Sequence, residues 1–210
     1  MKNNNEFIEL YTKIPPKKDI RTFIMGTTVS ADVFNYCVLY LYNSLSCPPI
    51  PNFILTFLKH IMICFSLFSA IFFIFPIKMN KLTYLYTAIA FTGTSIFDFY
   101  IASQVFLNEL DSPISYLIII ICILIYILIF AAVIINIKNK MKKGYVKNKP
   151  NIPFAKTFSA LCISVGIILA KQTELKDIPF AITLLVVSYI LIPTYSGFHK
   201  FYLIVKKKLN

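Results

Sequence analysis

The chain has little of what a soluble enzyme is usually built from. Only 14% of its 210 residues are charged, and it contains five glycines and no tryptophan. A soluble domain of this size is about one-quarter charged, so the composition excludes an ordinary globular fold in water. With so few glycines, a loop that cradles a phosphate is not expected, and no P-loop, zinc-protease, serine-hydrolase or calcium-loop motif occurs. The sequence therefore predicts no cofactor and favours a protein that is not an enzyme.

The five cysteines form neither a metal-binding pattern nor a disulfide framework. They are Cys37, Cys47, Cys64, Cys122 and Cys162; none belongs to a CxxC pair, and four of them lie in apolar segments. Isolated cysteines in such surroundings behave as small buried side chains. We therefore expect no metal site.

Long apolar runs are what the chain has instead, and 58% of its residues are hydrophobic. Residues 115–137 read SYLIIIICILIYILIFAAVIINI, with no charge and no polar face. A run of this length can cross the hydrocarbon core of a bilayer, which is about 30 Å thick. A soluble amphipathic helix would show one polar face. We predict an all-α, polytopic integral membrane protein.

Charged turns and prolines divide the rest of the chain into further spans. We predict a bundle of six transmembrane helices at about 24–45, 53–77, 82–107, 115–137, 155–170 and 178–195. A polar segment, 1–23, precedes this domain, and a basic tail, 196–210, follows it. That tail either continues the sixth helix with a kink or lies along the membrane surface. We expect 115–137 to be the most lipid-exposed span, and the first, third and fifth spans to supply the inner faces.

The charge distribution predicts the orientation. If both termini are cytoplasmic, eighteen of the twenty-one lysines and arginines fall in cytoplasmic segments. Positive charge gathers on the cytoplasmic side of membrane proteins, so this bias favours a multi-pass protein of the cell membrane with both ends inside. The same bias explains the net charge of +12, so no nucleic-acid partner is expected. The basic clusters are suited to anionic lipid headgroups.

Three charged residues lie within predicted spans and away from their ends: Asp32, Lys59 and Asp98. A charged side chain at the bilayer centre costs about 3 kcal/mol or more, so such groups usually face a bundle interior or a partner. The second and third spans are joined by a tight turn, and we predict an ion pair between Lys59 and Asp98. Asp32 has no such cation and is either protonated, hydrogen-bonded or in a wet cavity. A structural polar contact and a proton or ion role both remain open for the two aspartates.

Two local patterns have functional and structural interpretations. His60 and Cys64 are one helical turn apart, as in a cysteine nucleophile activated by histidine. The chain is similar in size and predicted span number to the small membrane-embedded cysteine peptidases of the AgrB family, but it lacks their His-rich segment leading to the cysteine. A packing role for the pair is therefore favoured. In the fifth span a stripe of small residues would allow close helix packing: Ala155, Ser159, Cys162, Gly166 and Ala170.

Three functions follow as hypotheses. The first is a non-enzymatic protein that binds a partner within the bilayer, as an immunity or accessory factor of a bacterial toxin or secretion system does; general composition alone suggests this. The second is a small transporter or channel subunit that uses Asp32, Asp98 and Lys59. The third is a membrane-embedded cysteine peptidase that uses His60 and Cys64. The expected partners are the lipid bilayer and, under the first hypothesis, another membrane protein or a toxin.

Overall fold

The computed structural model describes residues 11–13, 17–45, 47–143 and 177–206. The regular structure in these ranges is helical throughout, which confirms the predicted all-α class. Four of the described helices are long and apolar enough to cross a membrane: Asn52–Ile74, Thr83–Glu109, Ser112–Asn139 and Ile178–Lys206. The predicted total of six spans is not established, because 155–170 lies outside the described residues and the helix covering 24–45 is not among these four.

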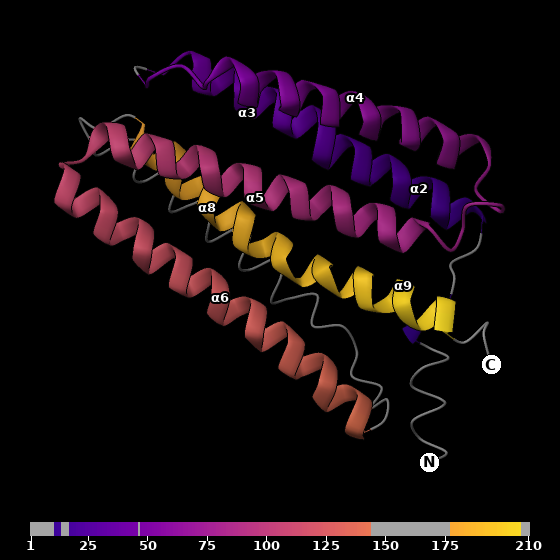
Figure 1. The fold of residues 1–210 in the computed structure, drawn as a ribbon. Helices are drawn as coiled ribbons and strands as arrows, with labels where there is room; N and C mark the ends of the chain where they lie inside the picture. Colours follow the sequence, from indigo (N-terminus) through magenta and orange to yellow (C-terminus); the bar gives the residue numbers. More distant parts are fainter. Residues whose placement is uncertain (1–10, 14–16, 46, 144–176, 207–210) are drawn as a thin grey trace.

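The elements are named in chain order as in Figure 1. They are α2 (Lys17–Thr28), η1 (Val29–Val33), α3 (Phe34–Asn43), α4 (Asn52–Ile74), α5 (Thr83–Glu109), α6 (Ser112–Lys143), α8 (Ile178–Leu191), η2 (Ile192–Tyr195) and α9 (Ser196–Lys206). The backbone is helical at both junctions of η1, with φ and ψ of −62° and −46° at Thr28 and of −61° and −47° at Phe34. Elements α2, η1 and α3 therefore form one continuous rod, called the first helix below. This rod starts seven residues before the predicted span at 24.

The middle of the first helix, η1, is a π-helical turn, and its position has a structural reason. Two side-chain contacts join the first helix to α5: Thr27 Oγ1 lies 3.5 Å from Thr87 Oγ1, and Asn35 Nδ2 donates to Thr94 Oγ1 at 3.1 Å. The contacts are eight residues apart on the first helix and seven apart on α5. A π turn accommodates one extra residue in a helix. The π turn between the contacts therefore lets both of them form.

This register argument predicts opposite results for two single-residue deletions. Val33 and Ile89 are both exposed, with 53% and 43% of their surface accessible, so little packing is lost when either is removed. Deleting Val33 leaves Thr27 and Asn35 seven residues apart, matching α5, and we expect the fold to be kept. Deleting Ile89 widens the mismatch and rotates the rest of α5 by about 100°. We expect that variant to melt at a clearly lower temperature in detergent; equal melting temperatures for the two variants would refute the register argument.

Helix α5 is the centre of the described bundle. Figure 1 shows it between the first helix with α4 on one side and α8 with α9 on the other, while α6 lies along the outside. In its most apolar stretch 56% of the residues are buried, against 6% in α6. The predictions that 115–137 is the most exposed span and that the third span faces inward are thus confirmed among the four candidate spans. The large contact between α8 and α5 was not predicted, because the sixth span is apolar on all sides.

The sixth span continues into the tail as one helix. Elements α8, η2 and α9 run without a break from Ile178 to Lys206, and Pro193, which has no N–H to donate, lies in the 3₁₀ turn η2. Of the two alternatives that the sequence left open, the helix with a local irregularity is the one found. Its 29 residues span about 43 Å, more than the hydrocarbon thickness.

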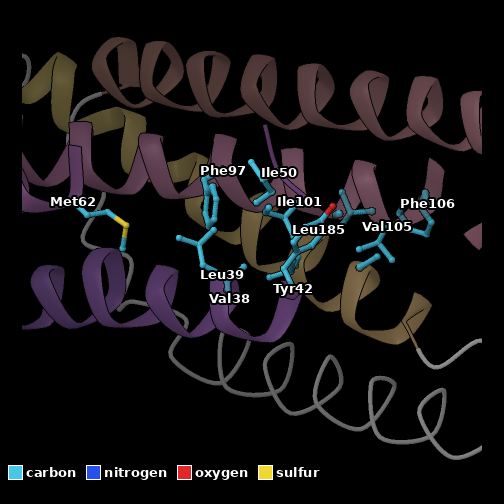
Figure 2. Close-up of a cluster of buried hydrophobic side chains, with 13 residues drawn as sticks. Val38, Leu39, Tyr42, Ile50, Met62, Phe97, Ile101, Val105, Phe106 and Leu185 are labelled. Atoms are coloured by element: carbon cyan, nitrogen blue, oxygen red, sulfur yellow. The ribbon is translucent and has the colours of Figure 1, made fainter. Parts of the chain in front are cut away.

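The apolar core lies where the first helix, α4, α5 and α8 meet. Figure 2 shows part of this cluster, in which side chains from α3 and α5 face one another. Its buried members include Val38, Leu39, Tyr42, Ile101 and Val105. The hydroxyl of Tyr42 donates to the carbonyl of Pro48 at 2.8 Å, which fixes the loop between α3 and α4 to the core.

Candidate functional site

A row of polar contacts runs along the interface of the first helix with α4 and α5. We call it the polar seam; its members are Thr27, Thr28, Asp32, Asn35, Ser66, Ser69, Tyr86, Thr87 and Thr94. Thr28 Oγ1 lies 2.5 Å from Ser69 Oγ, which also contacts the hydroxyl of Tyr86. In a bilayer polar side chains must find partners within the protein, and contacts between helices supply them. The seam thus holds three helices in register.

Asp32 lies in the π turn and is only partly satisfied by the seam. It is 4% exposed, and its Oδ2 accepts a hydrogen bond from Ser66 Oγ at 2.7 Å. Its Oδ1 is buried and has no hydrogen-bond partner among the described residues. Thr28, Asp32 and Asn35 take part in the seam, whereas the adjacent Tyr36 is exposed. The reason is that Tyr36 is rotated by about 100° from its buried neighbour Asn35.

Asn35 borders a small cavity between the first helix, α4 and α5. The cavity has a volume of about 70 Å³, and apart from Asn35 and Thr94 its walls are apolar. Asn35 is 8% exposed, and its Oδ1 has no hydrogen-bond partner in the described part of the chain. A single water needs roughly 10–15 Å³, so there is room for several. Ala31 and Phe97, the residues directly before the two aspartates, also line this space.

Asp98 is the most completely buried ionisable group in the described ranges. It is fully inaccessible, and neither carboxyl oxygen has a hydrogen-bond partner there. It lies about 22 Å along α5 from the first residue of the helix, and about 16 Å from the last. Asp98 follows Thr94 by one turn of α5, and Asn35 follows Asp32 by about one turn of the first helix. Asn35 and Thr94 are hydrogen-bonded to each other. A path of about two helical turns therefore leads from Asp32 through this pair to Asp98.

The predicted ion pair between Lys59 and Asp98 is not formed. Lys59 is exposed on α4, and both oxygens of Asp98 lack a partner in the described structure. The expectation assumed that a short turn makes α4 and α5 direct neighbours along their length. Instead, α4 packs mainly against the first helix, so Lys59 does not reach α5 at the depth of Asp98.

The second pair on α4, His60 and Cys64, does not form a catalytic arrangement. Both side chains are exposed, and His60 Nδ1 donates to the carbonyl of Thr56 at 2.7 Å. No hydrogen bond joins the two side chains within this described helix, so the geometry offers no activated thiol. The predicted small-residue stripe lies outside the described residues and includes Ala155, Ser159, Cys162, Gly166 and Ala170.

A second polar cluster, which the sequence did not indicate, joins α5 to α8 and α6. Ser95 Oγ donates to the carbonyl of Ser188 at 2.9 Å, and Ser188 Oγ donates to the carbonyl of Ser95 at 2.8 Å. The hydroxyl of Tyr126 lies 2.9 Å from Ser95 Oγ and 2.8 Å from the hydroxyl of Tyr195. Each of these groups has a partner. The cluster is therefore a structural contact, in contrast to Asp98, whose two carboxyl oxygens have no partner among the described residues.

Three side chains of types that bind metals in other proteins lie together at one end of the bundle. Ligand atoms of Cys47, Glu109 and Asp177 are within 4.8 Å of one another, although the residues come from three separate turns. Such a set could hold a divalent cation. Burial raises the pKa of the Cys47 thiol to about 11, and the negative charges of Asp177 and Glu109 add to the effect. Metals bind the thiolate, so the protonated thiol is a poor ligand at neutral pH. The sequence could not show this cluster, because its members are 62 and 68 residues apart.

The raised pKa predicts that Cys47 reacts slowly with alkylating reagents. The thiolate is the reactive form, and a shift of the pKa from 9.0 to about 11 lowers its fraction by about a hundredfold below pH 9. In a variant with Cys47 as its only cysteine, we expect the labelling rate to keep rising up to about pH 11. Replacing Asp177 with asparagine removes one negative charge and should speed labelling at pH 8. A labelling rate that already levels off near pH 9 would show that the pKa is not raised.

Comparison of the chain with protein-family models, curated protein sequences and solved structures finds no match in any of the three. The fold and the site themselves define a class: an α-helical protein with helices suited to a membrane and with buried acidic groups between them.

Proposed function

We propose that this protein is a small transporter or channel subunit that moves protons across the cell membrane, with Asp98 and Asp32 as the groups that carry them. The observation that supports this most is the carboxyl of Asp98, which is fully buried near the middle of α5 with neither oxygen hydrogen-bonded in the described structure. Intramembrane acids of this kind mark proton and ion paths in many membrane proteins.

The surroundings of Asp98 argue against a purely structural role. Burying a carboxylate without a partner costs several kcal/mol, and burying an unpaired neutral polar group also costs free energy. Ser95, three residues away on the same helix, shows that partners are available there for groups that hold helices together. An acid that serves packing would be bonded in the same way. An acid that must gain and lose a proton is better left without fixed partners.

The path between the two aspartates supports proton movement. The cavity lies beside Asn35 and Thr94, the two bonded residues between Asp32 and Asp98. Water in this space would have an acceptor in Asn35 Oδ1, which lines the cavity and lacks a described partner. The steps from Asp32 to Asn35 and from Thr94 to Asp98 each cover about one helical turn, or 5.4 Å, and a hydrogen bond of 3.1 Å joins Asn35 to Thr94. Lys59, which the sequence hypothesis placed on the path, has no part in it because it is exposed.

The orientation that we propose has six spans and both termini in the cytoplasm. Figure 1 shows the start of α2 and the ends of α4, α6 and α9 on one side of the bundle, and the end of α5 and the starts of α6 and α8 on the other. Lysines lie at or near the first set of helix ends, whereas Glu109, Asp111 and Asp177 lie at or next to the second set. The lysines include Lys17, Lys78, Lys138 and Lys206. The positive-inside rule favours the lysine side as the cytoplasmic one.

Proton flux into liposomes tests the proposal. Purified protein is reconstituted with a pH-sensitive dye inside the vesicles, and an inward proton gradient is applied. We expect the wild type to acidify the interior faster than protein-free vesicles, and Asp98→Asn to be no faster than these vesicles. Asp111→Asn, which changes an exposed acid after the same helix, should behave like the wild type. Unchanged flux in Asp98→Asn would rule out Asp98 as the carrier.

A second candidate, binding of a partner within the bilayer, is favoured by the surface of α6. Only 6% of its most apolar stretch is buried, so nearly the whole helix is available to lipid or to another membrane protein. An immunity or accessory factor of a bacterial toxin or secretion system would use such a face. Protection of cells that express a toxin encoded beside this gene, with Asp98→Asn protecting equally well, would favour this candidate over proton transport.

A further inference from the structure

A cleft opens between the end of α6 and the start of α9, away from the polar seam. Its volume is about 270 Å³, larger than the 70 Å³ cavity beside Asn35. The rings of Phe130 and Tyr195, with centroids 5.1 Å apart, close it at its deep end. Figure 1 shows the ribbons of α6 and α9 diverging toward the ends of these two helices. The contact between the two rings thus bounds the cleft on one side.

The lining of the cleft is mostly apolar and includes one lysine, on α6. Phe130, Ile134 and Ile137 line it on one face of α6, together with Lys138, which follows Ile134 by one turn. Lys138 is the residue before the last of the candidate span Ser112–Asn139, so it lies at the level of lipid headgroups. Across the cleft, α9 contributes His199, whose Nδ1 is buried without a hydrogen-bond partner in the described chain.

We propose that this cleft binds an anionic phospholipid, with one acyl chain between α6 and α9 and the phosphate at Lys138 and His199. The apolar lining and its one lysine match the acyl tail and the phosphate of such a lipid. Basic pockets between helices near a membrane surface are suited to anionic headgroups. A partner helix with an apolar face would match less well, since it would leave Lys138 without an anion. This inference does not depend on the proposed proton transport.

Lipid retention by the purified full-length protein tests this site. The protein is delipidated in detergent, incubated with phosphatidylglycerol or phosphatidylcholine of the same acyl composition, and analysed by native mass spectrometry. One lysine near the surface is worth about 1 kcal/mol, so we expect phosphatidylglycerol to bind about fivefold more tightly. Glycerol phosphate, which has no acyl chain, should not be retained. Equal retention of the two lipids, or binding of glycerol phosphate alone, would overturn the proposal.

Two variants and two controls locate the binding. Lys138→Gln should bring phosphatidylglycerol down to the affinity of phosphatidylcholine, while Ile134→Trp should fill the cleft and reduce retention of both lipids. Lys59→Gln changes an exposed lysine on α4, and Ile120→Trp changes an exposed residue of α6 that does not line the cleft. Both controls should bind like the wild type. If either cleft variant binds like its control, the lipid lies elsewhere and the assignment fails.

Discussion

Replacing Asp98 with leucine should raise the melting temperature of the protein while abolishing its proton flux. Leucine has the same branching as aspartate and needs no hydrogen bonds, so it suits a site where neither carboxyl oxygen has a described partner. An unsatisfied buried polar group costs about 1–3 kcal/mol, which the substitution recovers in part. Thermal unfolding in detergent and flux in liposomes measure the two effects. Opposite changes in stability and function are typical of functional sites.

The matched change at the other aspartate should have the opposite effect on stability. Asp32→Leu removes the acceptor of Ser66, a contact between the first helix and α4, and we expect it to lower the unfolding free energy by about 1 kcal/mol. If Asp98→Leu destabilises the protein as Asp32→Leu does, Asp98 has a structural role and the proposed function loses its main support.

Replacing Gly197 with alanine should separate α9 from α5 and strongly destabilise the protein. A β-carbon there would lie 2.8 Å from the carbonyl oxygen of Tyr84 and 2.9 Å from Cβ of Ala88. Both neighbours belong to the helix at the centre of the bundle, and a backbone oxygen cannot rotate away as a side chain can. Overpacking of this kind costs about 1–3 kcal/mol.

Gly26 supplies the control for this substitution. A β-carbon at Gly26 would meet nothing within 4 Å, so Gly26→Ala should be neutral or slightly stabilising, because alanine favours helices. Thermal unfolding of both variants in the same detergent compares them. Equal melting temperatures would show that α9 does not pack closely on α5.

The sequence predicted where the helices lie along the chain better than it predicted which helices pack against one another. Uncharged runs and charged turns located α4 and α5 to within three residues, because a chain in lipid forms helices at these lengths. Helix α6 begins three residues before the predicted span and ends six residues after it. The sequence left the structure of the tail open, because Pro193 and Gly197 can each interrupt a helix. In the structure the 3₁₀ turn accommodates Pro193, and Gly197 serves a close helix contact.

The site was predicted in part. Asp32 and Asp98 were singled out as charges within apolar runs, and both are buried. Their surroundings were not predictable, because the packing order of helices leaves no periodic signal in a chain that is apolar on most faces. The assumed pairing of α4 with α5 led to the wrong partner for Asp98. The contact of Asn35 with Thr94 needed the extra residue of the π turn, which no sequence pattern marked.

The central claim, that these helices cross a membrane with the lysine side in the cytoplasm, is tested most directly by cysteine accessibility. Ser112→Cys and Lys143→Cys, at the two ends of α6, are introduced singly into a variant without native cysteines and expressed in cells. An impermeant maleimide should label Ser112→Cys in intact cells, and should label Lys143→Cys only after the membrane is permeabilised. Labelling of Lys143→Cys in intact cells would contradict the orientation, and recovery of the protein in the soluble fraction without detergent would contradict membrane insertion itself.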